Sequence, residues 1–277
     1  MMLNLLITVV QIAGGILSGS LSLISDAFHN LSDAAAIIVT YIALRYSRKP
    51  KTFKYTFGFK RAEILAAMLN ASTLIIICFF MIKEAIERLQ HPTAIEGSLM
   101  LIVAVIGLAA NIIGTMLLKP GSQDNLNLRA TYFHLLSDSI ASVAIMIGAA
   151  GIIYFNIYWI DPVLTIGISL YIVREAYSIV KEAADVVMMS SPASIDIQEV
   201  RSVIEAISGV KNIHHVHIWK LNDADTHFEA HIEVENISTQ EATEIQKLIE
   251  RELHARYDIH HTTLQFECNK CTQQDIV

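Results

Sequence analysis

Two copies of one short motif contain the residues best suited to chemistry in this chain. Residues 28–33 and 133–138 both read Phe-His-x-Leu-Ser-Asp, so each copy contains a histidine followed four positions later by an aspartate. Residues four apart share one face of a helix, with Cβ atoms roughly 6 Å apart. A helix through either motif therefore presents one nitrogen and one oxygen ligand together.

Facing each other, the two motifs would supply two imidazoles and two carboxylates from His29, Asp33, His134 and Asp138. Four such ligands are the number that tetrahedral Zn²⁺ accepts, at about 2.0–2.2 Å. Two alternatives are a hydrogen-bonded structural couple within each helix, or aspartates that cap helices. An ionisable group inside an apolar span costs on the order of 3 kcal/mol and is by default a functional candidate. Because the pair occurs twice, we favour metal binding.

The surroundings of both motifs are strongly apolar. Hydrophobic residues make up 53% of the 277 residues and charged residues only 17%, which excludes an ordinary soluble domain. Apolar runs approach the roughly 20 residues that cross a bilayer. These runs predict six membrane helices, at about residues 2–20, 22–46, 63–86, 98–118, 130–156 and 161–181.

Charge predicts how these helices are oriented. The connector at residues 45–61 holds seven of the twenty basic residues, which favours a cytosolic position. An even number of spans then puts both termini in the cytosol. The motifs lie in spans two and five, so spans one to three and four to six are candidate repeats. Because three is odd, the second repeat is inverted, and spans two and five run antiparallel.

The last third of the chain has a different character. Residues 1–189 carry 13 basic and 12 acidic residues, whereas residues 190–277 carry 7 and 15. Hydrophobic periodicity predicts an α+β domain, ferredoxin-like or metallochaperone-like in type, with αββαβ order and two helices on one face of an antiparallel sheet. The predicted elements are a helix near 196–208, strands near 212–220 and 227–235, a helix near 239–256, and a strand near 261–267. We therefore expect a six-helix membrane domain at 1–189 and a cytosolic α+β domain at 190–277.

Further motifs extend over nearly the whole chain. They are Gly-x-Leu-Ser-Gly-Ser-Leu-Ser-Leu at 15–23, Phe-Gly-Phe-Lys-Arg-Ala-Glu at 57–63, Asp-Pro at 161–162, and His-x-x-His-Ile-Trp at 214–219. Together with the two His-x-x-x-Asp motifs, they make the chain resemble the cation diffusion facilitator family. The resemblance implies a homodimeric six-span metal/proton antiporter whose cytosolic αββαβ domain binds metal. Two histidines with two aspartates resemble the zinc-type transport site of that family.

Two departures limit what the resemblance implies. Some relatives carry a second His and Asp site in the connector after span two, but residues 51–61 contain neither residue type. A histidine-rich connector found in some animal relatives is also absent, because residues 119–128 contain no histidine. We therefore assign metal to neither connector.

Histidines also gather in the predicted cytosolic domain. Adjacent strands could bring several of these side chains together. The family resemblance implies an accessory metal site formed by His214, His231, either His260 or His261, and Glu267. The pattern does not choose between His260 and His261, and surface strands also carry histidine without metal. Cys268 and Cys271 form a Cys-x-x-Cys, which could bind zinc, form a redox pair, or have no function.

The function implied is efflux of a divalent cation from the cytosol, not enzymatic catalysis. Zn²⁺ is the expected substrate and ligand of the cytosolic domain, with Cd²⁺ or Co²⁺ as further candidates because affinities overlap on nitrogen and oxygen ligands. Protons are the expected counter-ion. We expect the protein to lie in the lipid of the cytoplasmic membrane and to bind no nucleic acid. The alternatives are a membrane-anchored metal sensor or scaffold acting through its cytosolic domain, and a thiol oxidoreductase using the two cysteines.

Overall fold

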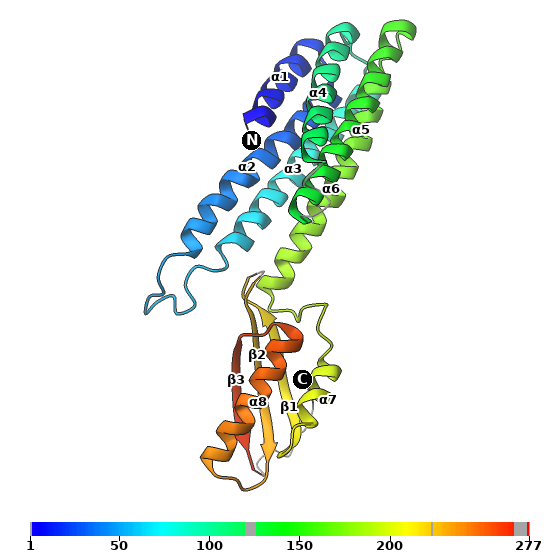
Figure 1. Ribbon diagram of the computed structural model, residues 1–277. Helices are drawn as coiled ribbons and strands as arrows, with labels where there is room; N and C mark the ends of the chain where they lie inside the picture. The colour runs from blue at the N-terminus through cyan, green and yellow to red at the C-terminus, as the bar shows by residue number, and fades with distance from the viewer. Residues whose placement is uncertain (1, 120–125, 223, 269–275, 277) are drawn as a thin grey trace. The chain divides into compact units, whose positions relative to one another are not determined.

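Six long helices form the first part of the structure, a computed structural model that describes residues 2–119, 126–222, 224–268 and 276 (Figure 1). They are α1 (Met2–Ser18), α2 (Leu21–Ser47), α3 (Ala62–Gln90), α4 (Gly97–Leu118), α5 (Leu126–Phe155) and α6 (Ile160–Val187). Within the described residues, α2 to α6 are long and apolar enough to cross a membrane, while the apolar part of α1 is shorter, at Leu5–Ser18. The helical membrane domain predicted from the apolar runs is confirmed.

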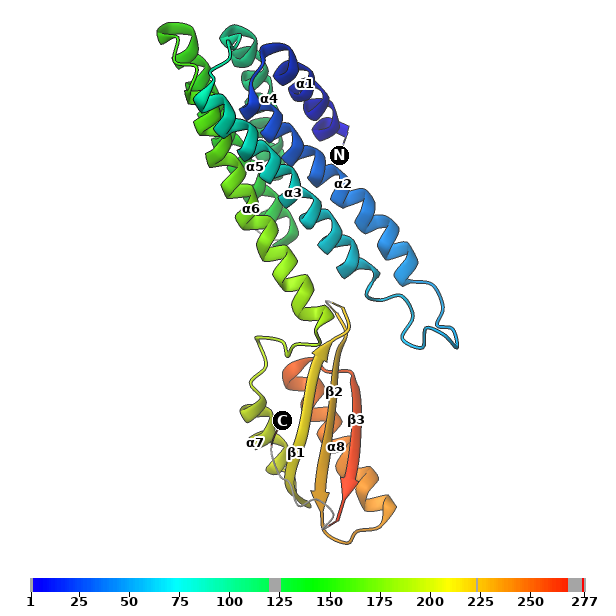
Figure 2. The same ribbon diagram turned by 180° about the vertical axis from the view of Figure 1, so that it is seen from behind.

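The helices alternate in direction along the bundle, so α2 and α5 run antiparallel as the inverted repeat predicts (Figures 1 and 2). Contacts join α1 to α4 and α4 to α5. Small residues allow close packing where helices meet: a Cβ at Gly14 of α1 would overlap the side chain of Val103 in α4. Close packing of this kind is what holds helices together in lipid, where burial from water contributes little.

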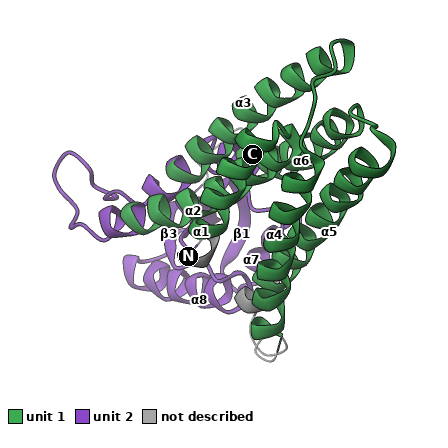
Figure 3. Ribbon diagram, turned by 90° about the horizontal axis from the view of Figure 1, so that it is seen from above, with its two compact units in different colours: residues 1–42, 66–180 green, residues 43–65, 181–277 purple. Residues whose placement is uncertain are grey.

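The chain divides into two compact units (Figure 3). One comprises residues 1–42 and 66–180, and the other residues 43–65 and 181–277. The second unit contains the predicted αββαβ order as α7 (Ile197–Glu205), β1 (Val210–Lys220), β2 (Thr226–Val234), α8 (Thr239–Tyr257) and β3 (His261–Glu267). The order of elements is therefore confirmed.

The three strands form one sheet in the order β1-β2-β3. β1 pairs antiparallel with β2, with His214 opposite His231. β3 pairs parallel with β2, so the prediction of an antiparallel sheet is wrong for this strand. The physical reason is the connection: α8 crosses over the sheet and returns the chain to the start of a strand running the same way as β2.

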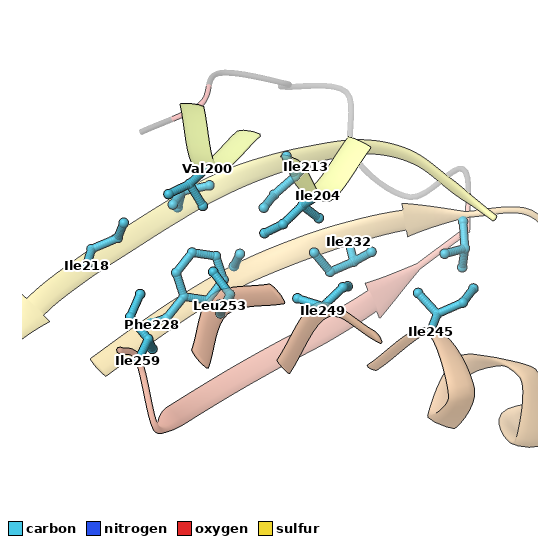
Figure 4. Close-up of a cluster of buried hydrophobic side chains, with 13 residues drawn as sticks. Val200, Ile204, Ile213, Ile218, Phe228, Ile232, Ile245, Ile249, Leu253 and Ile259 are labelled. Atoms are coloured by element: carbon cyan, nitrogen blue, oxygen red, sulfur yellow. The ribbon is translucent and has the colours of Figure 1, made fainter. Parts of the chain in front are cut away.

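Both helices of this unit pack on the sheet through a common core (Figure 4). Ile204 of α7, Phe228 of β2 and Ile249 of α8 are each almost fully buried there. The helix ends are fixed locally. α8 begins with a capping box in which Ser238 and Glu241 satisfy each other's backbone N–H groups. This core holds β1, β2 and β3 in a fixed register, which determines where their histidines meet.

Candidate metal centres

The two repeated motifs meet inside the helical unit. His29 and Asp33 come from α2, and His134 and Asp138 from α5. Ligand atoms of His29, Asp33 and His134 all lie within 4.8 Å of one another. Asp138 completes a ring of four, because its carboxylate oxygens lie 3.5 Å from Nε2 of His29 and 3.7 Å from Nε2 of His134. We call these four side chains the intramembrane ring.

The distances around the ring show which of its members are hydrogen-bonded to one another. Nε2 of His134 lies 3.0 Å from Oδ2 of Asp33, which is a hydrogen bond between helices. Within each helix the nitrogen-to-oxygen distance is 3.7 Å, for His29 to Asp33 and for His134 to Asp138, which is too long for one. The hydrogen-bonded couple within each helix, an alternative raised by the sequence, does not form.

Exposure is uneven around the ring. The side chains of His134 and Asp33 are 36% and 30% exposed, whereas those of His29 and Asp138 are 9% and 5% exposed. In α2, Asp33 lies one turn nearer than His29 to the connector at residues 48–61. Because α5 runs the opposite way, His134 is likewise nearer that end than Asp138. The two more exposed members of the ring therefore lie nearer the ends of α2 and α5 that adjoin residues 48 and 126, and the two buried members lie farther from those ends.

A buried polar network lies beside His29, one of the two buried members of the ring. Gln11 of α1 donates through Nε2 to Asp26 of α2, and its Oε1 accepts from Asn30 of α2 at 3.0 Å. All three side chains are buried. Neither Asp26 nor Gln11 is among the site residues predicted from the sequence. Polar residues inside apolar spans were the available signal.

A second polar feature fixes the start of α2. The carboxylate of Asp161 in α6 accepts from the hydroxyls of Ser20 and Ser22 and from the backbone N–H groups of Leu21 and Ser22. Asp161 itself is fully buried. In the sequence it stands out only as part of the Asp-Pro motif at 161–162. It also caps a helix 140 residues earlier, which sets the position of the first ring motif.

Replacing Asp161 with alanine is expected to destabilise the protein by about 3 kcal/mol or more, because buried donors at the start of α2 lose a charged acceptor. Transport should fall with it, since α2 carries half of the ring. Thermal unfolding of the purified protein in detergent measures the loss. Asp185→Asn, at an exposed position of α6, is the matched control and should leave the melting temperature unchanged. Equal melting temperatures for both variants would rule out the capping role.

A second cluster forms on the sheet of the other unit. His214 of β1, His231 of β2 and Glu267 of β3 have ligand atoms within 4.8 Å of one another. Nε2 of His214 lies 3.6 Å from Oε2 of Glu267, and Nδ1 of His231 lies 3.3 Å from Oε1 of the same carboxylate. We call these three residues the sheet cluster.

The nitrogens of the sheet cluster fit a metal. His214 is 2% exposed, yet within the described residues neither of its ring nitrogens has a hydrogen-bond partner, nor does Nδ1 of His231. Buried polar atoms are almost always paired, so these unpaired imidazole nitrogens are suited to binding a metal. Burial lowers the pKa of His231, and the neighbouring His214 and His215 lower it further, although Glu267 opposes them. A neutral imidazole is the form that binds metal.

The other predicted cytosolic ligands lie elsewhere. His261 begins β3 beside His227, with ring centroids 4.2 Å apart, and His260 contacts Asp258 at 3.0 Å before the strand begins. His261 and Glu267 are six steps apart along the strand, about 20 Å at 3.3 Å per residue. The structure therefore brings neither His260 nor His261 into the sheet cluster.

Of the two cysteines in the Cys-x-x-Cys motif, the structure describes only Cys268, and this residue is not among the grouped ligands of either cluster. Cys268 directly follows Glu267, is exposed, and forms no disulfide. Cys271 lies outside the described residues.

The connector between α2 and α3 belongs to the same compact unit as the sheet and contacts it, which the sequence did not predict. Nζ of Lys60 lies 2.7 Å from a carboxylate oxygen of Asp225, just before β2, and lowers the pKa of that carboxyl. The ring of Phe57 lies edge-on to His227, with centroids 5.4 Å apart. Burial, followed by the positive character of His261, lowers the pKa of His227.

A helical membrane domain with polar residues buried in its interior, joined to a C-terminal α/β domain, defines an integral membrane protein of the transporter class. Comparison with protein families gives the particular group. Residues 1–188 match the cation efflux transmembrane domain, and residues 192–268 match the cytoplasmic domain of cation efflux proteins. The chain therefore belongs to the cation efflux, or cation diffusion facilitator, family, which consists of transporters and not enzymes. The resemblance seen in the sequence is confirmed.

Curated relatives are similar over almost the full chain. The zinc transporter ZitB of Escherichia coli is 38% identical over 268 residues, covering 96% of this chain and 85% of the relative. The cadmium, cobalt and zinc/H(+)-K(+) antiporter of Bacillus subtilis is 35% identical, covering 94% and 84%. Among solved structures, the metal-bound C-terminal domain of the CzcD transporter from Cupriavidus metallidurans is 33% identical, covering 26% of this chain and 99% of that chain, with a TM-score of 0.25.

Proposed function

We propose that this protein exports Zn²⁺, and to a lesser extent Cd²⁺ and Co²⁺, from the cytosol in exchange for protons. The observation that carries the proposal is the intramembrane ring, two imidazoles and two carboxylates gathered from antiparallel helices. The names of the relatives support the choice of substrates, because they include a zinc transporter and an antiporter of cadmium, cobalt and zinc with protons and potassium.

The spacing of the ring suits a tetrahedral ion. Ligands at about 2.05 Å from a tetrahedral zinc lie about 3.3 Å from one another. The four nitrogen-to-oxygen distances around the ring run from 3.0 to 3.7 Å, on either side of that value. Small shifts of α2 against α5 would bring all four groups onto one ion.

The uneven exposure of the ring supports alternating access. With the basic connector at residues 48–61 in the cytosol, the exposed His134 and Asp33 face the cytosol, and the buried His29 and Asp138 face away from it. This is the arrangement of a site loading from the cytosol. Rocking of one three-helix repeat against the other would open the His29 side and release the ion outward.

Further parts of the proposal concern the assembled protein. Residues 192–268 match the cytoplasmic domain of cation efflux proteins. We infer that the transporter is a homodimer. We place both termini in the cytosol, the protein in the cytoplasmic membrane, and the boundary between membrane and cytosolic domains at residue 190. The acidic excess after that residue suits a domain that attracts cations.

A metal panel tests the proposed substrate class. Purified protein in liposomes is expected to move Zn²⁺, Cd²⁺ and Co²⁺ at least about tenfold faster than Mg²⁺ and Ca²⁺, because those hard cations prefer all-oxygen shells with six or more ligands. A metal-sensitive dye trapped inside reports the flux, with protein-free liposomes as the control. Equal rates for Mg²⁺ and Zn²⁺ would exclude a selective imidazole-containing site.

We propose in addition that the sheet cluster holds a resident Zn²⁺. His214, His231 and Glu267 would be its ligands, and the metal would stabilise the folded domain by joining three strands. Saturating zinc at about a hundred times the Kd contributes about 2.7 kcal/mol. In a domain of this size that corresponds to a rise of roughly 10–20 °C in melting temperature.

Residues 190–277, expressed alone, are the sample for this prediction. The zinc-dependent rise should disappear in His214→Ala and persist in His254→Ala, whose histidine lies on α8. Calorimetry with and without zinc measures both variants. An unchanged melting temperature of the parent fragment at saturating zinc contradicts the resident metal.

A further inference from the structure

His215 has a backbone conformation that is unusual for a strand. Its φ is 53°, in the left-handed region that favours glycine. The other described non-glycine residues with positive φ, Asn156, Met189 and Asp258, lie at helix ends or in connections, so His215 is the one that lies inside a strand. A residue held in such a conformation indicates that something other than local preference determines it.

The cause is a β-bulge in β1. His214 pairs with His231 and His217 pairs with Glu229, so three steps along β1 match two steps along β2. The extra residue interrupts the alternation by which neighbouring side chains point to opposite faces of a strand. Two consecutive histidines can then lie beside the same partner.

The ring positions agree with this consequence. The centroid of the His215 ring lies 4.8 Å from that of His231, with the ring planes tilted by 39°. The ring of His214 lies 5.4 Å from the same His231 ring. His231 is therefore flanked by both histidines of the bulge.

We propose that His215 is the fourth ligand of the metal held by the sheet cluster. The proposal rests on the proposed resident metal. His214, His231 and Glu267 provide three donors, and a closed zinc site has four. His214 and Glu267 are buried, whereas His215 is exposed, and its imidazole would turn toward the cluster when metal binds.

Neighbouring donors are less suited to this role. His217 is also exposed, and its ring contacts that of His215 at 4.7 Å, but it lies opposite Glu229 and not beside His231. His227 lies four residues before His231 along β2, next to His261. His215 thus supplies the metal with a solvent-facing ligand, and metal enters and leaves on that side.

The structure provides a conformationally matched substitution. His215→Gly removes the imidazole and keeps a residue that favours the left-handed backbone, so the bulge should persist. His215→Asn likewise tolerates this backbone. His217→Ala removes the adjacent imidazole and is the control. Metal-free melting temperatures of His215→Gly at or above that of the parent would verify that the fold is intact.

The experiment uses the full chain in detergent with Asp33→Ala and Asp138→Ala as the parent, so that the intramembrane ring does not bind metal. Co²⁺ is titrated and its visible absorption recorded, because tetrahedral cobalt absorbs far more strongly than five- or six-coordinate cobalt. We expect a strong band in the parent and in His217→Ala. His215→Gly and His215→Asn should bind Co²⁺ at least about tenfold more weakly, and their band should shift or weaken because water replaces the imidazole.

Two results overturn the proposal, and they can be told apart. If His215→Gly keeps the parent's band and affinity while His214→Ala loses both, the metal site exists but His215 is not a ligand. If the parent itself does not bind a stoichiometric amount of Co²⁺, the proposal of a resident metal is wrong, and so is the proposal that His215 is its fourth ligand.

Discussion

Zinc transport is expected to fall by more than about a hundredfold when His134 is replaced with alanine, and equally when His29, Asp33 or Asp138 is replaced. Each substitution removes one of four ligands from the antiparallel helices α2 and α5, whose neighbouring nitrogen and oxygen atoms lie 3.0–3.7 Å apart. Changes in residues that only orient metal ligands already cost ten- to a hundredfold in affinity, so loss of a ligand itself should cost more.

Matched variants separate loss of a ligand from loss of the fold. Asp138→Asn keeps the size of the side chain and removes its charge, and it should be as inactive as Asp138→Ala. His91→Ala changes an exposed histidine just after α3 and should transport normally. The rates are measured in liposomes with equal amounts of protein of verified melting temperature. Near-normal flux in His134→Ala would remove the ring from the mechanism.

Zinc affinity of the ring is expected to weaken as the pH falls toward about 6. Binding needs neutral imidazoles and ionised carboxylates, so metal entry displaces protons. Without metal, two carboxylates in a poorly solvated bundle repel each other, which favours retention of at least one proton by the empty ring. Lower pH raises the proton concentration that competes for the same atoms, and the unperturbed pKa of histidine near 6.5 puts this competition in the physiological range.

Calorimetric titration in buffers of different ionisation enthalpy measures the number of protons released for each zinc bound. The sample is the full chain carrying His214→Ala and His231→Ala, so that only the ring contributes. We expect at least one proton per zinc and a loss of about tenfold in affinity per pH unit for each proton. An affinity that is constant between pH 8 and 6 contradicts competition at a shared site.

The repeated motif made much of the helical part predictable. The apolar runs predicted the helices. The spacing of four residues between histidine and aspartate predicted a nitrogen and an oxygen ligand on one face of each motif helix. The odd number of spans in each repeat gave the antiparallel relation of α2 and α5. These are local or periodic properties, so they can be read along the chain.

Features that depend on long-range contacts were not predictable. Asp161 caps α2 from 140 residues away, and nothing beside it in sequence indicates this partner. The parallel pairing of β3 places His261 opposite His227, and Gln265 opposite His231, so the register keeps His261 out of the sheet cluster. The bulge at His215 depends on how β1 and β2 pair. The three histidines at positions 214, 215 and 217 do not by themselves specify that pairing.

Simultaneous recording of zinc and proton movement tests metal/proton antiport through the ring most directly. Liposomes containing the protein, a zinc-sensitive dye and a pH-sensitive dye are given a pH gradient, acid inside or acid outside. The account predicts that zinc moves into the acid compartment as protons leave it, that reversing the gradient reverses the zinc flux, and that Asp138→Asn shows neither movement. Zinc flux that ignores the gradient, with no counter-movement of protons, would contradict antiport and indicate a channel or uniporter.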